Sequence, residues 1–216
     1  MSNKEKVNPF QDRDLTVRLA WPTLSWSSLN SFANYDREEW YTRYVLGVRG
    51  EVNPAMLAGI EIGERWATDE TYMPEVERPE IFEQELFAKL SGIQLTGHID
   101  GLHLTKKKKL QELKTSQSSK RWTAKTVRTW GQIDFYCLLL WLNYKIKPEE
   151  LEIELIYVPV VANDEGVVIR TSQPPVVIPT ERTMWDMLLF AEYIKNTYQE
   201  MQDYVIHRQK LQGKSK

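Results

Sequence analysis

Apolar residues recur at helical spacing in four stretches of the chain, and each stretch predicts a helix. The expected helices cover residues 24–47, 54–68, 122–144 and 181–205. Ser25 or Ser27 is suited to cap the start of the first helix, and Gly47 to end it. Pro54 suits the first turn of the second helix, because the missing N–H of a proline costs nothing there.

Between these stretches the period of the pattern changes to that of β-strands. Residues 80–114 predict three strands, with a turn at Ser91 and Gly92 and a polar lysine run at the second connection. Residues 151–161 and 166–172 predict a hairpin around an Asn-Asp-Glu-Gly turn, and 175–180 predict a further short strand. This order of elements indicates an α/β (α+β) fold with a mixed central sheet.

Length and composition limit the kind of protein. With 216 residues, 42% of them hydrophobic, the chain predicts one compact domain over 1–216, with flexible ends at about 1–20 and 206–216. No stretch has the apolar length of a membrane span, so we expect a soluble, intracellular protein with no membrane partner. Cys137 is the only cysteine and lies in an apolar run, which predicts a core residue. A single cysteine excludes an intrachain disulfide and a cluster or zinc ion held by several thiolates.

The net charge of −2 hides a strongly basic segment. Residues 105–128 contain nine Lys or Arg residues and a single acid, Glu112, so the local net charge is +8. This imbalance favours contact with a polyanion, and the alternative is a solvated hairpin tip and helix start. Trp122 in this segment is suited either to stack on an unpaired base or to pack against its own helix.

Three residues of the strand region form a candidate site. Asp100 ends one expected strand, and Glu112 lies in the next, so hairpin pairing can bring the two carboxylates together. Glu112 and Lys114 are two positions apart and therefore project from the same face of their strand. Carboxylate oxygens are ligands that Mg²⁺ and Mn²⁺ prefer, and a neighbouring lysine can act on a water and offset phosphoryl charge. The alternative is a surface carboxylate pair with a Glu–Lys ion pair.

The chain resembles the PD-(D/E)XK nuclease superfamily, and within it the RecB-like and phage-exonuclease-like branch. Gly97-His98-Ile99-Asp100 looks like the branch's Gly-x-Ile-Asp, and Glu112-Leu113-Lys114-Thr115-Ser116 looks like its acid-x-Lys-Thr-Ser. Gln132 and Tyr136 match the Gln-x-x-x-Tyr helix, and Leu24 to Gly47 resembles the opening helix. The motifs span about residues 24–136 in the family's order, which is more specific than any one of them.

The resemblance implies a restriction-endonuclease-like core and assigns roles to the site residues. Asp100 and Glu112 would hold Mg²⁺ or Mn²⁺, Leu113 would lend its backbone carbonyl, and Lys114 would act on the attacking water. Gln132 and Tyr136 lie one helical turn apart and would border the site or contact the substrate; the alternative is a helix surface that merely packs.

Two positions depart from the branch's pattern. Tyr35 stands where members with an iron–sulfur cluster have a cysteine, so no cluster is expected. Gly63 stands where many members have a metal-binding histidine. Glu64, or Glu61 one turn earlier, is the expected replacement ligand, with Glu64 preferred.

The implied activity is metal-dependent hydrolysis of DNA, most simply as an exonuclease in recombination, repair or phage DNA processing, in the cytoplasm of a prokaryote or of a phage-infected host. Other recombination proteins and further copies of the chain are expected partners. Phosphate contacts, which carry no base specificity, are assigned to Lys106, Lys107, Lys108, Lys109, Lys120, Arg121, Lys125 and Arg128. The rival interpretations are a non-catalytic nucleic-acid-binding protein with a degenerate nuclease fold, and an enzyme that acts on RNA or nucleotides.

Overall fold

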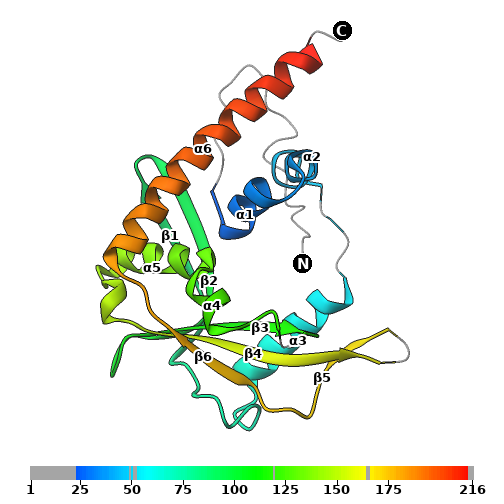
Figure 1. The fold of residues 1–216 in the computed structure, drawn as a ribbon, viewed down its shortest axis with the longest axis vertical. Coiled ribbons are helices and arrows are strands. Elements are labelled where there is room, and N and C mark those ends of the chain that lie inside the picture. Colours follow the sequence, from blue (N-terminus) through cyan, green and yellow to red (C-terminus); the bar gives the residue numbers. More distant parts are fainter. Residues whose placement is uncertain (1–22, 49, 51–52, 119, 164–165, 214–216) are drawn as a thin grey trace, which may run out of the picture.

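The computed structural model describes residues 23–48, 50, 53–118, 120–163 and 166–213 (Figure 1). Strands in this part of the chain are β1 (Ile81–Leu90), β2 (Ile93–His103), β3 (Lys109–Ser116), β4 (Glu152–Ala162), β5 (Val168–Arg170) and β6 (Val176–Thr180). Helices are α1 (Trp26–Asn34), α2 (Arg37–Trp40), the π-helical turn η1 (Tyr41–Val45), α3 (Pro54–Thr68), α4 (Ala124–Arg128), α5 (Gly131–Tyr144), the 3-10 turn η2 (Pro148–Glu150) and α6 (Met184–Gly213).

The six strands form one mixed sheet within the described residues. Its order is β1-β2-β3-β4-β5, and β6 pairs with β4 beside β5. The β3–β4 pair is parallel, because α4 and α5 carry the chain back across the sheet, while the other pairs are antiparallel. Ser91 and Gly92 both have positive φ at the β1–β2 turn, as a two-residue hairpin turn requires. The predicted mixed α/β (α+β) sheet, with its three consecutive strands and the later hairpin, is confirmed.

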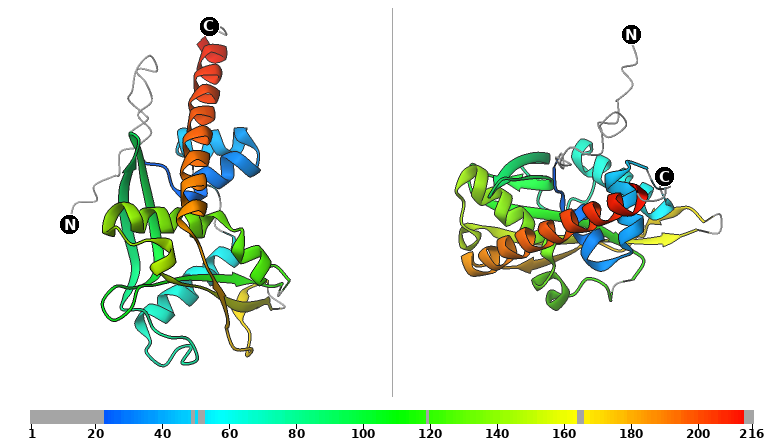
Figure 2. Two further views of the ribbon diagram at one scale, coloured as in Figure 1. Left: turned by 60° about the vertical axis from the view of Figure 1, so that its left-hand side comes forward. Right: turned by 90° about the horizontal axis from the view of Figure 1, so that it is seen from above.

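Helices cover both faces of the sheet (Figure 2). The larger core packs α1, α5 and α6 against β1 and β2, and buries Leu29, Ile99 and Cys137 completely, so Cys137 is the predicted core residue. A second cluster packs α3, through Ile62 and Trp66, against β3 and β4. Helices α5 and α3 therefore pack on the sheet in two different core clusters, and the side chains of the central strands lie between the two helices.

Gly97 allows α5 to approach β2 closely. A Cβ atom at this position would lie 2.7 Å from Leu139 Cδ1 and 3.0 Å from Tyr136 Cε1. Real Cβ atoms essentially never come within 3.0 Å of another heavy atom, so a larger residue would require the side chains of α5 that pack on β2 to shift. The glycine of the Gly-x-Ile-Asp motif thus positions the helix that carries Gln132 and Tyr136.

The first expected helix, 24–47, is not continuous. Ser25 caps α1 as expected, but α1 ends at Asn34, and Asp36 caps a new helix by accepting hydrogen bonds from the N–H groups of Glu38 and Glu39. The prediction was wrong here because an aspartate that bonds the following N–H groups starts a helix rather than continuing one. Leu46 N–H then bonds Tyr41 C=O, a π-helical turn, before Gly47 with positive φ.

The expected helix 122–144 is also broken, between α4 and α5. Thr129 and Trp130 leave helical geometry, and the buried guanidinium of Arg182 binds the carbonyls of Val127 and Trp130 that the break exposes. This partner is 52 or more residues away in sequence, so helical periodicity alone does not reveal the break.

The last helix extends further than expected. It begins at Met184 and continues to Gly213, past the predicted end at residue 205 and into the segment expected to be a flexible end. The other expected flexible end, 1–20, lies outside the described residues. None of the helices described here combines the length and apolar character needed to cross a bilayer.

Candidate active site

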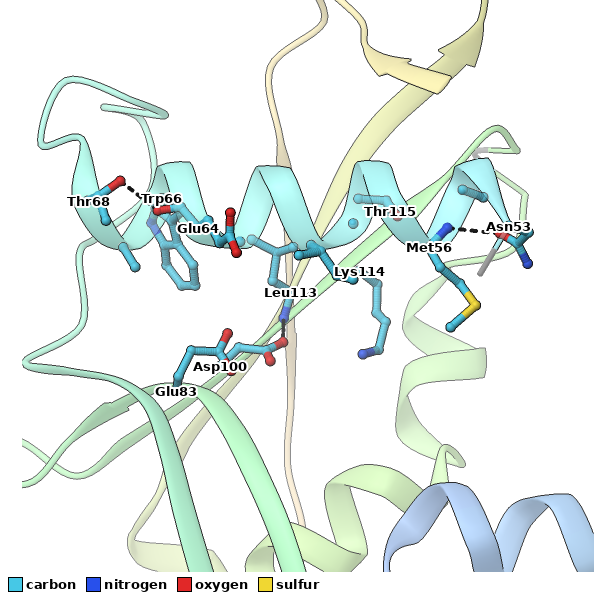
Figure 3. A pocket seen from close by; sticks show the side chains of 15 residues that line it. Asn53, Met56, Glu64, Trp66, Thr68, Glu83, Asp100, Leu113, Lys114 and Thr115 are labelled. Atoms are coloured by element: carbon cyan, nitrogen blue, oxygen red, sulfur yellow. Dashed lines mark hydrogen bonds between the residues drawn. The ribbon is translucent and has the colours of Figure 1, made fainter. Parts of the chain in front are cut away.

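Asp100 and Glu112 lie where β2 and β3 separate. The β2–β3 pairing runs from His103 and Lys109 to Gly101 and Gln111. It therefore ends one step before the positions of Asp100 and Glu112, which would be the next pair in this register. Beyond that point, the N–H of Leu113 donates to Asp100 Oδ2 at 2.7 Å (Figure 3). Since the N–H and C=O of one strand residue point to the same side, the Leu113 carbonyl also faces the edge from which Asp100 projects.

Glu112 is the central buried acid of the site. Its side chain is 0% exposed, and Oε1 lies 2.5 Å from the ammonium nitrogen of Lys114. The amide of Gln132 donates to the same oxygen at 2.7 Å. Oε2 is also buried and accepts no hydrogen bond from an N–H or hydroxyl donor among the described residues, and the neighbouring carboxyl group of Asp100 can satisfy it only through a shared proton. Because an unsatisfied carboxylate oxygen is costly in a core, this atom indicates a missing cationic or proton-donating partner.

Helix α5 supplies the other side of this network. Gln132 Nε2 also donates to Tyr136 Oη at 2.7 Å, and one helical turn places these two residues on the same face. The two amide hydrogens of Gln132 therefore serve Glu112 and Tyr136. The structure thus brings Glu112, Lys114, Gln132 and Tyr136 into one hydrogen-bonded cluster, with Asp100 beside it.

The electrostatics of the cluster follow from burial. Burial and the charge of Asp100 raise the pKa of Glu112 to about 8, and burial also raises the pKa of Asp100. Burial would lower the pKa of Lys114, but the carboxylates of Glu112 and Asp100 raise it above its usual value. Two adjacent buried carboxyl groups with one ammonium are thus short of positive charge, and a bound cation would favour their ionised forms.

A cleft of about 820 Å³ opens beside Asp100, between the sheet and α3. Leu113, Lys114 and Thr115 border it from β3, and Gly59, Gly63 and Glu64 border it from α3 (Figure 3). The exposed carboxylate of Glu64 points from the helix toward Asp100, whereas Glu61 is not among the residues that line the cleft. Of the two predicted replacements for the histidine, Glu64 is therefore the better placed.

Glu83 also lines the cleft, and the sequence analysis did not predict it. It lies in β1 beside Asp100, and burial together with the charge of Asp100 raises its pKa. In the sequence it is one of two glutamates in Ile-Phe-Glu-Gln-Glu-Leu, where either one fits the solvent face of a strand. The signal that singles it out, a φ of 48°, exists only in the folded backbone.

The oxygen donors of the site suit a hard divalent cation, although they do not form a complete coordination shell. Within the described residues, no three Asp, Glu, His or Cys side chains converge as a ready metal site. Two carboxylates and a carbonyl meet at the strand edge, and one buried carboxylate oxygen accepts no hydrogen bond from an N–H or hydroxyl donor of the described residues. Oxygen donors of this kind suit Mg²⁺ or Mn²⁺ and not softer metals.

The basic residues divide into two groups. Lys107, Lys108 and Lys109 form ion pairs with glutamates, and the side chain of Lys109 is only 4% exposed. Arg128 pairs with Asp186. By contrast, no ion pair within the described residues involves four exposed residues, Lys106, Lys120, Arg121 and Lys125. Because Lys109 is buried and its charge is balanced by glutamates, the prediction that it contacts phosphate was wrong.

Trp122 packs within the protein. Its ring lies 4.8 Å from that of Trp130, and both pack against a cluster formed by Val127, Leu155 and Ile178. Of the two interpretations of this tryptophan, the structure supports packing.

Comparison with known proteins agrees with this geometry. The sequence pattern of the PD-(D/E)XK nuclease superfamily matches residues 33–212. A candidate exonuclease from Eubacterium rectale is similar in structure, with a TM-score of 0.55, 12% identity, and coverage of 85% of this chain and 82% of that one. A phage-related exonuclease from Haemophilus somnus 129PT is also similar, with a TM-score of 0.51, 14% identity, and coverage of 80% and 81%.

At such identities the two structures show the fold alone, and a search of curated proteins found no match. The superfamily pattern, in contrast, covers most of the chain, and the part that it covers includes Asp100, Glu112 and Lys114. The chain therefore belongs to the PD-(D/E)XK nuclease superfamily.

Proposed function

We propose that the protein hydrolyses phosphodiester bonds of DNA with the help of Mg²⁺ or Mn²⁺. The observation that carries this proposal is the surroundings of Glu112. A fully buried carboxylate beside a second carboxylate, with one oxygen that accepts no N–H or hydroxyl hydrogen bond from the described residues, is expensive in a core unless a cation binds there. The nuclease superfamily supplies a use for such a cation.

Each residue of the site then has a role that its contacts support. Asp100 and Glu112 would hold the ion, together with the carbonyl of Leu113 and the carboxylate of Glu64 at the cleft wall. A divalent ion there would polarise the scissile phosphate and make a bound water more acidic. The ammonium of Lys114 orients the attacking water and offsets negative charge on the phosphoryl group. Gln132 keeps Glu112 in place through its bond to Oε1 and is itself held by Tyr136.

The DNA would be held by its phosphates. Lys106, Lys120, Arg121 and Lys125 are exposed and unpaired within the described residues, so they are available for such contacts. An exonuclease acting in recombination, repair or phage DNA processing is the form of this activity that we propose. It rests on the motifs and on the likeness to two proteins that are described as exonucleases, a description that concerns those proteins alone.

Digestion of end-labelled linear DNA, with a covalently closed circle alongside, tests the proposal in Mg²⁺, Mn²⁺ and EDTA. We expect wild type to degrade the linear DNA only with metal, and Lys114→Ala to lose about 10²- to 10⁴-fold in rate. Lys195→Ala is the matched control, because Lys195 forms a surface ion pair on α6 with Glu192, far from the site in sequence.

Other outcomes lead to different conclusions. Intact DNA under every metal condition, with DNA still bound, would replace the proposal with the non-catalytic binding protein. Cleavage of RNA in preference to DNA would change the substrate. Cleavage that survives Lys114→Ala would remove the assigned site.

A further inference from the structure

Glu83 has a backbone conformation that strands avoid. Its φ is 48°, in the left-handed region, although it lies within β1 and is not a glycine. In the β1–β2 register Phe82 pairs with Gly101, and Gln84 pairs with Ile99. Glu83 lies opposite Asp100, between these two pairs, but does not itself form a pair. Such a conformation costs a non-glycine residue on the order of 1–3 kcal/mol. The rest of the hairpin holds it in place.

The side chain of Glu83 has no structural partner that would explain this cost. Within the described residues it forms no hydrogen bond and no ion pair. It lies instead in the cleft beside Asp100, where two negative charges approach each other (Figure 3). The neighbouring Glu85 differs, because it pairs with His98 at 3.3 Å. A carboxylate held next to another carboxylate in a cleft is suited to bind a cation.

Helix α3 leaves space above this carboxylate. A Cβ atom added to Gly63 would lie 3.9 Å from Glu83 Oε1, so a side chain at position 63 would point at Glu83. The glycine keeps that volume open for a ligand between the helix and the two acids. Glu83 therefore faces position 63 of α3, and a longer side chain at that position would reach into the site.

We propose that Glu83 is a third carboxylate of the metal site: a divalent cation would draw Glu83, Asp100 and Glu112 together, although these three side chains do not converge as a ready site by themselves. The inference rests on the proposed function and adds a residue to the same site. An observation that does not involve Glu83 supports it, the buried Oε2 of Glu112, which needs a cationic or proton-donating partner.

Calorimetric titration with Mn²⁺ tests this inference without relying on activity. We expect Glu83→Gln to weaken Mn²⁺ binding by about 10- to 100-fold. Asp100→Asn should lose binding as well, whereas Glu61→Gln, on α3 but outside the cleft lining, should bind as wild type does. Glu64→Gln measures the contribution of the other candidate acid, and we expect it to weaken binding less than Glu83→Gln.

Thermal unfolding separates a metal residue from a structural one. In EDTA, Glu83→Gln and Glu83→Gly should melt at or above the wild-type temperature, because a repulsion is removed and glycine accepts the positive φ. In Mn²⁺, both should gain less in melting temperature than wild type. Glu83→Gly also keeps the test valid if Glu83→Gln folds poorly.

The outcomes separate the two proposals. If Asp100→Asn loses Mn²⁺ and both Glu83 variants bind it as tightly as wild type, Glu83 is not part of the metal site, and the proposed function stands. If wild type itself binds no Mn²⁺, both proposals fail.

Discussion

Two glutamates show how the surroundings decide the behaviour of a carboxyl group in this protein. Glu112 is buried beside Asp100, and its pKa is raised to about 8. Glu77 lies near the surface, where Lys107 and Lys109 bind its carboxylate and lower its pKa to about 2. The first carboxylate binds Lys114 through one oxygen only, so its other oxygen is suited to bind a cation, while the second carboxylate neutralises two lysines of the basic segment.

The lowered pKa of Glu77 predicts a stability effect in acid. Because the folded-state pKa lies below the unfolded one, the stabilisation is fully present above about pH 4.5 and is lost as the pH falls toward 2. Glu77→Gln should therefore lower the free energy of unfolding at pH 7 by about 1 kcal/mol or less, since the pair is partly screened by solvent. Urea unfolding at pH 7 and at pH 3 should show the difference between variant and wild type shrinking.

Glu70→Gln is the control for this prediction, because Glu70 is exposed and has no ion pair among the described residues. It should leave stability unchanged at both values of pH. A Glu77→Gln difference as large at pH 3 as at pH 7 would show that the ion pairs with the lysines are not its source.

Among the elements, the junction of α4 and α5 depends on one distant arginine. Arg182 follows β6, is 1% exposed, and binds the Asp134 carboxylate of α5 at 2.6 Å. It also donates to the carbonyls of Val127 at 2.9 Å and Trp130 at 3.3 Å. The ring of Trp130 in turn lies 5.3 Å from the ammonium of Lys114. Arg182 thereby links the break in the helix to the wall of the candidate site.

Removal of this arginine should destabilise the protein strongly. Arg182→Ala leaves Asp134 and two carbonyls without their buried partner, and we expect a loss of about 3–5 kcal/mol in the free energy of unfolding. Arg128→Ala is the matched control, because its pair with Asp186 is partly exposed and should contribute about 1 kcal/mol or less. Urea unfolding measures both. Equal small losses would mean that the buried pair is no stronger than the surface pair.

Across the whole molecule, ion pairs redistribute the charge of the basic segment. At the start of β3, acids from other parts of the chain form ion pairs with Lys107, Lys108 and Lys109. These lysines therefore contribute little to the positive electrostatic potential at the surface. Most of the positive charge that remains available lies after β3, at Lys120, Arg121 and Lys125, and only Lys106 precedes the strand. A polyanion should therefore bind mainly to this later part of the segment.

Salt dependence of DNA binding tests that distribution. For duplex DNA, each lost phosphate contact reduces the slope of log K against log salt by about 0.9. Combined substitution of Lys120, Arg121 and Lys125 by alanine should reduce the slope by about 2–3, whereas Lys107→Ala with Lys108→Ala should change it little. Fluorescence anisotropy with labelled DNA in EDTA gives the slopes. A larger effect from the second pair would place the DNA on the other end of β3.

Local pattern was enough to predict most of the fold and the residues of the site. Alternating strands, the Ser91-Gly92 turn and the apolar stretch around Cys137 depend on neighbours a few positions away, and the sequence shows these directly. Glu112 and Lys114 meet because strand geometry puts residues two apart on one face. The spacing of Gln132 and Tyr136 likewise fixes their common face, whereas their place beside Glu112 was expected only from the resemblance to the nuclease superfamily.

Only the tertiary structure decided how those residues are used. The breaks after Asn34 and Arg128 depend on a competing cap and on the distant Arg182. The ion pairs that balance the charge of Lys109 depend on Glu77 and Glu154, which lie far along the chain. The place of Glu83 depends on one unusual φ angle. Burial and contacts between distant segments determine which charges are balanced, which side chains are exposed and where the backbone is strained. The local spacing of residues in the sequence does not reveal these properties.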